Sequence, residues 1–157
     1  MKQIVVGESL ILALFAKVDD EDFPLLSRLK WYPMRVRDSD VMYAQTVFGG
    51  SSRNTILMHQ LVMGNAPRGM VIDHINTNGL DNQKENLRFL PNAENIRRRY
   101  EDNPDTGIKL KPDKIENPWQ ASISVGGKTR HVGYFPTKEL AKAARDEFLE
   151  EWLKSNE

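Results

Sequence analysis

The sequence predicts an α+β fold made of three consecutive segments. Short stretches of alternating apolar and polar residues dominate the first segment, which indicates a small β-rich unit. The second segment shows a strand–loop–strand–helix order, and the third shows a three-stranded sheet followed by one long amphipathic helix. The first two segments together form one predicted domain and the third forms another. The boundaries are residues 1–58, 59–100 and 107–157, with a linker at residues 101–106.

The first segment alternates in "QIVV", "LILALFAKV", "YPMRVR", "MYAQTVF" and "NTILM", and each stretch predicts a strand. Between them, "DDEDFPLLSRLKW" begins with acidic residues suited to a helix N-terminus, and Phe23, Leu26 and Leu29 follow at helical spacing. We expect one short helix there and a hairpin loop at "GGSSRN". No chemical motif is evident in this segment.

In the second segment a short helix, "HQLVMG", precedes two apolar runs, "MVIDHI" and "LRFL", that predict a pair of strands. Between the runs, "NTNGLDNQKEN" is rich in turn formers. Pro91 and Asn92 then open a predicted helix, with Asn92 as its N-cap.

In the third segment "GIKLK", "WQASISV" and "KTRHVGYF" predict three strands, the last two joined by a "GG" hairpin turn. Thr137 is the expected N-cap of the following helix. Leu140, Ala144, Phe148 and Trp152 recur every four residues and predict its buried face. Before this segment, "YEDNPDTG" is polar and contains a proline and a glycine, as linkers do.

Composition limits the class of protein. With 39% hydrophobic and 28% charged residues, the chain is globular rather than disordered. The 22 basic residues balance 22 acidic ones, which excludes a generic polycation, although residues 59–100 hold six basic against four acidic residues. The chain contains no cysteine, so disulfides and cysteine-zinc sites are excluded and a reducing cytoplasm is expected. We expect no membrane span, because no apolar run approaches ~20 residues. We also expect no signal peptide, because the start has one lysine, the early acidic Glu8, strand-like alternation and no small-residue cleavage site.

The pattern "DHIN…DNQKENLRFLPNAEN" resembles the HNH nuclease family, which folds as a ββα-metal hairpin and helix, and the resemblance covers residues 59–97. It implies that His74 is the general base that activates water against a DNA phosphodiester. It also implies that Asp73 and Asn95 are ligands of one divalent metal, and that Asn86 ties the loop together by backbone hydrogen bonds.

The residue types suit this chemistry. An imidazole with an ordinary pKa of ~6.5 can accept a proton from water at neutral pH. A hard cation prefers oxygen ligands, so Mg²⁺ is the expected metal and Mn²⁺ the alternative. His59 recurs in proteins of this kind, where it orients the hairpin or contacts phosphate; a structural role is the alternative. Because Asp73 and His74 are adjacent, strict alternation would point them to opposite faces, so we expect the strand to end or twist there.

Two further regions are candidates for DNA contact. Arginines on the helix after the second strand can pair with phosphate, or can instead interact with the helix dipole. The stretch "WQASISVGGKTRHVGYFPTKELAKAARDEF" is similar to the APETALA2-type DNA-binding domain, which implies that the sheet face opposite the helix enters the major groove. The predicted DNA-binding residues are Arg97, Arg98, Arg99, Lys109, Lys111, Gln120, Ser122, Ser124, Lys128, Thr129 and His131.

The chain departs from that second family. Its predicted DNA face carries serines, glutamine, threonine and histidine where the family has arginines and a second tryptophan, and Arg130 replaces an apolar, helix-facing residue. Base reading is therefore expected to be weaker or different, with affinity depending on the lysines.

Together the two resemblances imply a metal-dependent HNH endonuclease of the phage or homing type. Its partner would be double-stranded DNA in the cytoplasm of a bacterial host, with no obligate protein partner. A single site would nick one strand as a monomer. Two alternatives remain open: a DNA-binding regulator with an inert nuclease centre, and a nonspecific, toxin-like nuclease.

Overall fold

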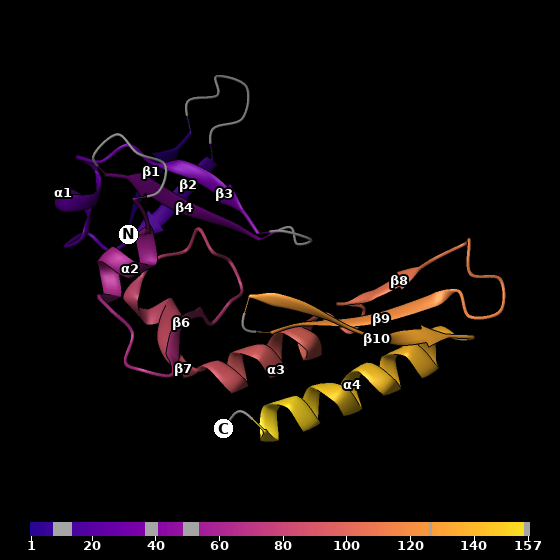
Figure 1. The fold of residues 1–157 in the computed structure, drawn as a ribbon. Helices are drawn as coiled ribbons and strands as arrows, with labels where there is room; N and C mark the ends of the chain where they lie inside the picture. The colour runs from indigo at the N-terminus through magenta and orange to yellow at the C-terminus, as the bar shows by residue number, and fades with distance from the viewer. Residues whose placement is uncertain (8–13, 37–40, 49–53, 126, 156–157) are drawn as a thin grey trace. The chain divides into compact units, whose positions relative to one another are not determined.

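A computed structural model describes residues 1–7, 14–36, 41–48, 54–125 and 127–155. It confirms an α+β fold with several small antiparallel sheets (Figure 1). The chain forms two compact units, Met1–Pro91 and Asn92–Glu157. None of the helices in the described ranges is long and apolar enough to cross a membrane.

The first unit contains the predicted β-rich segment. A hairpin of β1 (Lys2–Val6) and β2 (Leu14–Val18) accompanies a three-stranded sheet in the order β3–β4–β5. The strands of that sheet are β3 (Tyr32–Arg35), β4 (Met42–Val47) and β5 (Thr55–Leu57). Alternate residues of β1, β2 and β4 point inward, so they form one core with Leu26 and Trp31. The "GGSSRN" loop, apart from Asn54, and the first residues of "LILALFAKV" lie outside the described residues.

The predicted short helix is α1 (Phe23–Leu26). Leu26 is buried, and Phe23 and Leu29 pack against the same core, as their spacing predicted. The acidic residues before α1 make no side-chain cap; Asp19 instead binds the later loop, accepting from the backbone nitrogen of Lys84 at 2.8 Å.

The second predicted segment begins with α2 (Met58–Met63), whose start is held by Gln60 Oε1 accepting from Leu57 N at 2.9 Å. It continues with the antiparallel pair β6 (Met70–His74) and β7 (Leu87–Pro91), joined by a loop that ends in the 3₁₀ turn η1 (Lys84–Asn86). The loop pairs with the edge of β2: Lys17 N donates to Leu80 O, and Asn82 N donates to Lys17 O, each at 2.8 Å. The N-terminal hairpin therefore supports the loop.

Two details of the predicted helix start were wrong. Pro91 is the last residue of β7, opposite Met70, and Asn92 is the first residue of α3 (Asn92–Asp102) rather than its cap. Proline is tolerated at a strand end, where its missing N–H interrupts no interior ladder bond. Glu101 and Asp102, which were predicted to begin the linker, are the last residues of α3.

The second unit contains the predicted three-stranded sheet, in the order β10–β9–β8, with helix α4 packed along it (Figure 1). Its elements are β8 (Ile108–Leu110), β9 (Trp119–Val125), β10 (Lys128–Phe135) and α4 (Lys138–Lys154). The hydroxyl of Thr137 accepts from Leu140 N at 3.2 Å, which confirms the predicted cap. Ile96 and Tyr100 of α3 join the core formed by β9 and α4.

The buried stripe of α4 lies one residue away from the prediction. It consists of Ala141, Arg145, Leu149 and Leu153, whereas Leu140 is 51% exposed and Phe148 and Trp152 are only partly buried. Both stripes repeat every four residues, but the true one includes an arginine and so looks less apolar.

Arg145 is only 2% exposed, and its guanidinium has hydrogen-bond and ion-pair partners. Its guanidinium donates to the carbonyls of Pro104 and Thr106 at 2.8 and 2.7 Å, and it lies 5.2 Å from the ring centroid of Tyr100. It also pairs with Asp146 at 2.6 Å. This side chain therefore anchors the turn that follows α3 to the core of the second unit.

Candidate active site

His74 is the last residue of β6 and is only 5% exposed. The expected end of the strand therefore falls at this residue. Its Nε2 lies 3.4 Å from Oδ1 of Asn82, a side chain with no exposed surface. Asp73 precedes it, opposite Arg88 of β7, and its Oδ2 accepts from Arg88 Nε at 2.9 Å.

The loop between the two strands is held by a network of asparagine side chains. Asn86 accepts from Asn76 N at 3.0 Å through its side-chain oxygen and donates to Asp81 O at 2.7 Å. Both bonds join the Asn86 side chain to backbone atoms of the loop, and the part of Asn86 in the site stays a prediction. Thr77 adopts a left-handed φ of 62° in the same loop, which is rare for a β-branched residue.

Asp81 and Asn82 belong to this loop and are buried. Asp81 Oδ2 accepts from Asn76 Nδ2 at 3.1 Å and lies 3.8 Å from Lys17 Nζ. Because Asn82 N is bonded to the carbonyl of Lys17, the first unit's N-terminal hairpin fixes the backbone that presents Asn82 to His74. Sequence reasoning placed both residues in a turn and assigned neither a part in the site.

Three rings meet at the site. The ring centroids of His59 and His74 lie 5.1 Å apart, and Tyr43 of β4 lies 5.4 Å from His59 and 5.5 Å from His74. Tyr43 comes from the first segment, in which the sequence shows no chemical motif. In the sequence Tyr43 is one more aromatic residue of a strand, and only tertiary packing reveals its contact with His74.

Burial favours the neutral form of both histidines. It lowers the pKa of His59 to about 4, with a further contribution from charge on nearby His74. Burial also lowers the pKa of His74, against the opposing effects of the Asn82 hydrogen bond and the carboxylates of Asp73 and Asp81. Burial raises the pKa of Tyr43, and the negative charge of Asp73 adds to this. The pKa of His74 therefore lies below its ordinary value, which favours the uncharged imidazole.

Asn95, the second predicted metal ligand, is half-buried on α3 in the second unit. Its role as a ligand stays a prediction. Within the described ranges, no three histidine or acidic side chains gather in a way that could hold a metal ion. The predicted ligand set, one carboxylate and one amide, is not such a group.

The predicted arginines of α3 make contacts inside the second unit. Arg97 Nε lies 3.3 Å from Glu150 Oε1, and Arg99 donates to the carbonyl of Ser124 and lies over the ring of Tyr100. The contact of Arg97, Arg98 and Arg99 with DNA stays a prediction.

The sheet of the second unit has an open face opposite the helices. Ala121, Ile123 and Val125 are buried, whereas Gln120, Ser122 and Ser124 alternate with them on the other face. The register adds three predicted residues to this face: Lys109 opposite Gln120, His131 opposite Ser122, and Thr129 opposite Ser124. The predicted polar residues of β9 and β10 thus come together.

Hydrogen bonds and rings connect this face. Gln120 Nε2 lies 3.3 Å from His131 Nδ1, and the hydroxyls of Ser124 and Thr129 lie 3.1 Å apart. Tyr134, which the sequence did not single out, lies opposite Gln120 with its ring 4.8 Å from that of His131.

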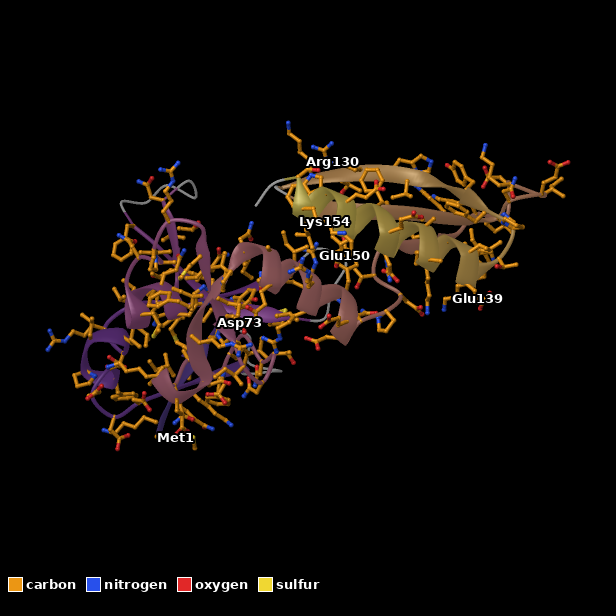
Figure 2. The ribbon with its side chains drawn as sticks, turned by 90° about the horizontal axis from the view of Figure 1, so that it is seen from below. Met1, Asp73, Arg130, Glu139, Glu150 and Lys154 are labelled. Carbon is orange, nitrogen blue, oxygen red and sulfur yellow. The ribbon has the colours of Figure 1, made fainter. Side chains whose placement is uncertain are left out.

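Three basic residues lie around the face rather than within it. Lys128 is exposed at the start of β10, and Lys111 follows β8, where its backbone nitrogen binds the carbonyl of Pro118. Arg130 pairs with Ile123 of the helix-facing set but is itself exposed (Figure 2). Basic charge therefore flanks a mainly neutral polar surface.

The segment that contains β6, β7 and their loop matches a known protein family. Residues 56–97 match the model of the HNH endonuclease family. The chain is also 28% identical over 128 residues to an uncharacterized HNH endonuclease of Acanthamoeba polyphaga mimivirus. That alignment covers 81% of this chain and 64% of the relative, so the chain spans less than two thirds of the relative's length. No solved structure matches the chain. The matched segment ends before β8, so the APETALA2-type resemblance stays a prediction.

Proposed function

We propose that this chain is a DNA endonuclease that hydrolyses phosphodiester bonds with His74 as general base. The observation that carries the proposal is a buried, uncharged imidazole at the end of β6, beside the Asp73 carboxylate and inside the segment that matches HNH endonucleases. Such an imidazole can accept a proton from an attacking water, an effect worth roughly 10²–10⁴ in rate.

Asn82 determines which nitrogen of His74 is the base. The Oδ1 of Asn82 can only accept a hydrogen bond, so the facing Nε2 carries the proton and donates. Nδ1 then holds the lone pair that receives the proton from water. Asn82 itself is fixed by its bond to the carbonyl of Lys17, so the tautomer depends on the N-terminal hairpin.

The donor chemistry fits one hard divalent cation, Mg²⁺ or alternatively Mn²⁺. Asp73 supplies a carboxylate next to His74, held in place by Arg88, and the family resemblance adds the amide oxygen of Asn95 as the second ligand. A bound cation would neutralise charge on the phosphate and stabilise the leaving oxygen.

The proposed substrate is double-stranded DNA, contacted by the open face of the β10–β9–β8 sheet and the lysines beside it. The polar side chains of this face, among them Gln120 and His131, offer donors and acceptors to base edges, while lysines contact phosphate. The protein would nick one strand as a monomer in the cytoplasm of a bacterial host.

Supercoiled plasmid, incubated with the protein and Mg²⁺ or Mn²⁺ with and without a chelator, tests this function. Open circles formed only with metal support a nicking enzyme, and linear product supports paired sites. If the protein binds DNA but leaves the plasmid supercoiled with either metal, the proposal is wrong and a DNA-binding regulator with an inert centre becomes the better account.

A further inference from the structure

Tyr43 contacts His74 from outside the segment that matches the HNH family. It lies in β4, thirteen positions before residue 56, the first matched residue. Its ring centroid lies 5.5 Å from that of His74, tilted by 42°, and 5.4 Å from that of His59, nearly perpendicular at 75°. The ring therefore contacts the imidazole of His74 from a different sheet.

The same ring also touches the loop that carries Asn82. A Cβ atom added to Gly79 would overlap with Cδ1 of Tyr43 and with the backbone oxygen of Met42. Only a glycine allows the loop to approach β4 this closely. Tyr43 thus contacts His59 of α2, His74 of β6, and the loop at a point three residues before Asn82.

These contacts restrict a side chain that its own backbone leaves free to rotate. The χ2 torsion of a histidine is broad and roughly two-fold, so strand geometry alone does not set the ring angle. The Asn82 hydrogen bond, at 3.4 Å, is long and fixes only one ring atom. Packing against Tyr43 and His59 supplies the remaining constraint on the plane of the imidazole.

We propose that Tyr43 is a positioning residue for His74, because its ring fixes both the imidazole and the loop that presents Asn82. This inference rests on the proposed nuclease function. A displacement of about 1 Å at a catalytic group can cost ~10² in rate. The Tyr43→Leu substitution removes the ring but keeps apolar volume, and it should lower kcat by roughly 10–100-fold and leave KM unchanged.

The kinetic test compares Tyr43→Leu, Tyr43→Phe and the matched control Tyr32→Leu, which alters an exposed tyrosine of β3 in the same sheet. Tyr43→Phe should retain kcat within about twofold, because it keeps the ring. All assays run at temperatures where circular dichroism shows each variant fully folded, so a loss of stability alone would leave kcat per folded molecule unchanged. A kcat for Tyr43→Leu within twofold of the original protein overturns the proposal.

A second measurement does not depend on activity. The imidazole C–H resonances of His74 in an NMR spectrum should show contacts with the Tyr43 ring, and should shift and broaden in Tyr43→Leu while those of His131 stay in place. If the original protein cleaves no DNA, the proposed function fails, but this spectrum still decides whether Tyr43 holds the imidazole. Unchanged His74 resonances in Tyr43→Leu overturn the positioning.

Discussion

At the scale of single residues, His59 shows how the fold controls protonation near the site. The residue is 7% exposed, and its Nδ1 is buried without a hydrogen-bond partner. A charged imidazole in that position would lose its hydration without gaining a compensating bond, so the neutral form is favoured. The unfolded chain, in contrast, protonates His59 near its ordinary pKa of ~6.5.

This difference predicts a pH-dependent stability. Because the folded-state pKa of about 4 lies below the unfolded value, the unfolded state binds more protons between these two values. The contribution of His59 is fully present above about pH 6.5 and falls as the pH falls towards 4, by up to about 3 kcal/mol. Urea denaturation at several pH values should show a shallower decline for His59→Leu, whereas Leu25→Ala, which alters an exposed, non-titratable residue of the same unit, keeps the original decline. Equal declines in all three proteins would contradict the assignment.

Substitution of Asn82 should lower the rate of DNA cleavage without changing the affinity for DNA. In Asn82→Ala the Nε2 of buried His74 loses its acceptor, which should cost about 1–3 kcal/mol of stability. Cleavage should fall by roughly 10–100-fold, as expected when the partner that orients a catalytic group is removed. Affinity for DNA, measured by fluorescence anisotropy, should not change. The control is Asn65→Ala, which alters an exposed loop residue. Equal cleavage by both variants would contradict the orienting role of Asn82.

The positions of His74, Asp73 and Asn86 in the strand–loop–strand pattern could be read from the motif, whereas their roles stay predictions. Tyr43 was not predictable, since its contact with His74 joins residues 31 positions apart in different sheets. Asn82 was assigned to a turn for a similar reason: its burial follows from the pairing of the loop with β2, a long-range contact.

At the scale of elements, strands were predicted more accurately than the face of the last helix. Both β9 and β10 have the predicted bounds, because the alternation of "WQASISV" and "KTRHVGYF" and the glycines between them are local signals. The buried face of α4 was wrong by one residue because Arg145, a charged residue, occupies it. Its partners are backbone carbonyls of a turn, which no side-chain pattern reveals.

Arg145 therefore gives a prediction for the second unit. Arg145→Met keeps the length of the side chain but leaves the carbonyls of Pro104 and Thr106 without their donor, which should lower the free energy of unfolding by about 2–4 kcal/mol. Indole NMR signals of Trp119 and Trp152 report on this unit, and that of Trp31 on the first. The first two should lose dispersion at lower urea concentration than before, while exposed Arg130→Met leaves all three unchanged. An unaltered transition for Trp119 and Trp152 would contradict the anchoring role.

At the scale of the whole molecule, basic and acidic residues are equal in number, 22 of each. The net charge is zero, so the proposed DNA binding would depend on local lysines rather than on the overall field. The proposal places Lys109 and Lys128 at phosphates, which makes binding salt-dependent.

The double variant Lys109→Ala/Lys128→Ala should weaken DNA binding and reduce the slope of log K against log salt by roughly 2, about 0.9 for each lost phosphate contact. Lys154→Ala, at the C-terminal end of α4, is the matched control in the same unit (Figure 2). Anisotropy titrations at several salt concentrations give both slopes. An unchanged slope in the double variant would place the DNA-binding surface elsewhere.

The fold class could be read from the sequence at this scale, since each unit is built from locally signalled strands and helices. The division into compact units could not, because α3 follows β7 without a break, and its packing against the second core, through residues such as Ile96 and Tyr100, is a long-range contact. The predicted functional division, residues 1–100 and 107–157, stays a prediction.

The proposed function depends on His74 acting as the general base, and a comparison of three proteins tests this role. Supercoiled plasmid is incubated with Mg²⁺ and the original protein, His74→Ala or the control Lys154→Ala, at equal DNA occupancy. Open circles are expected with the original protein and Lys154→Ala, and a loss of at least ~10²-fold in the rate is expected with His74→Ala. Equal nicking by His74→Ala would overturn this role and assign the base to another residue.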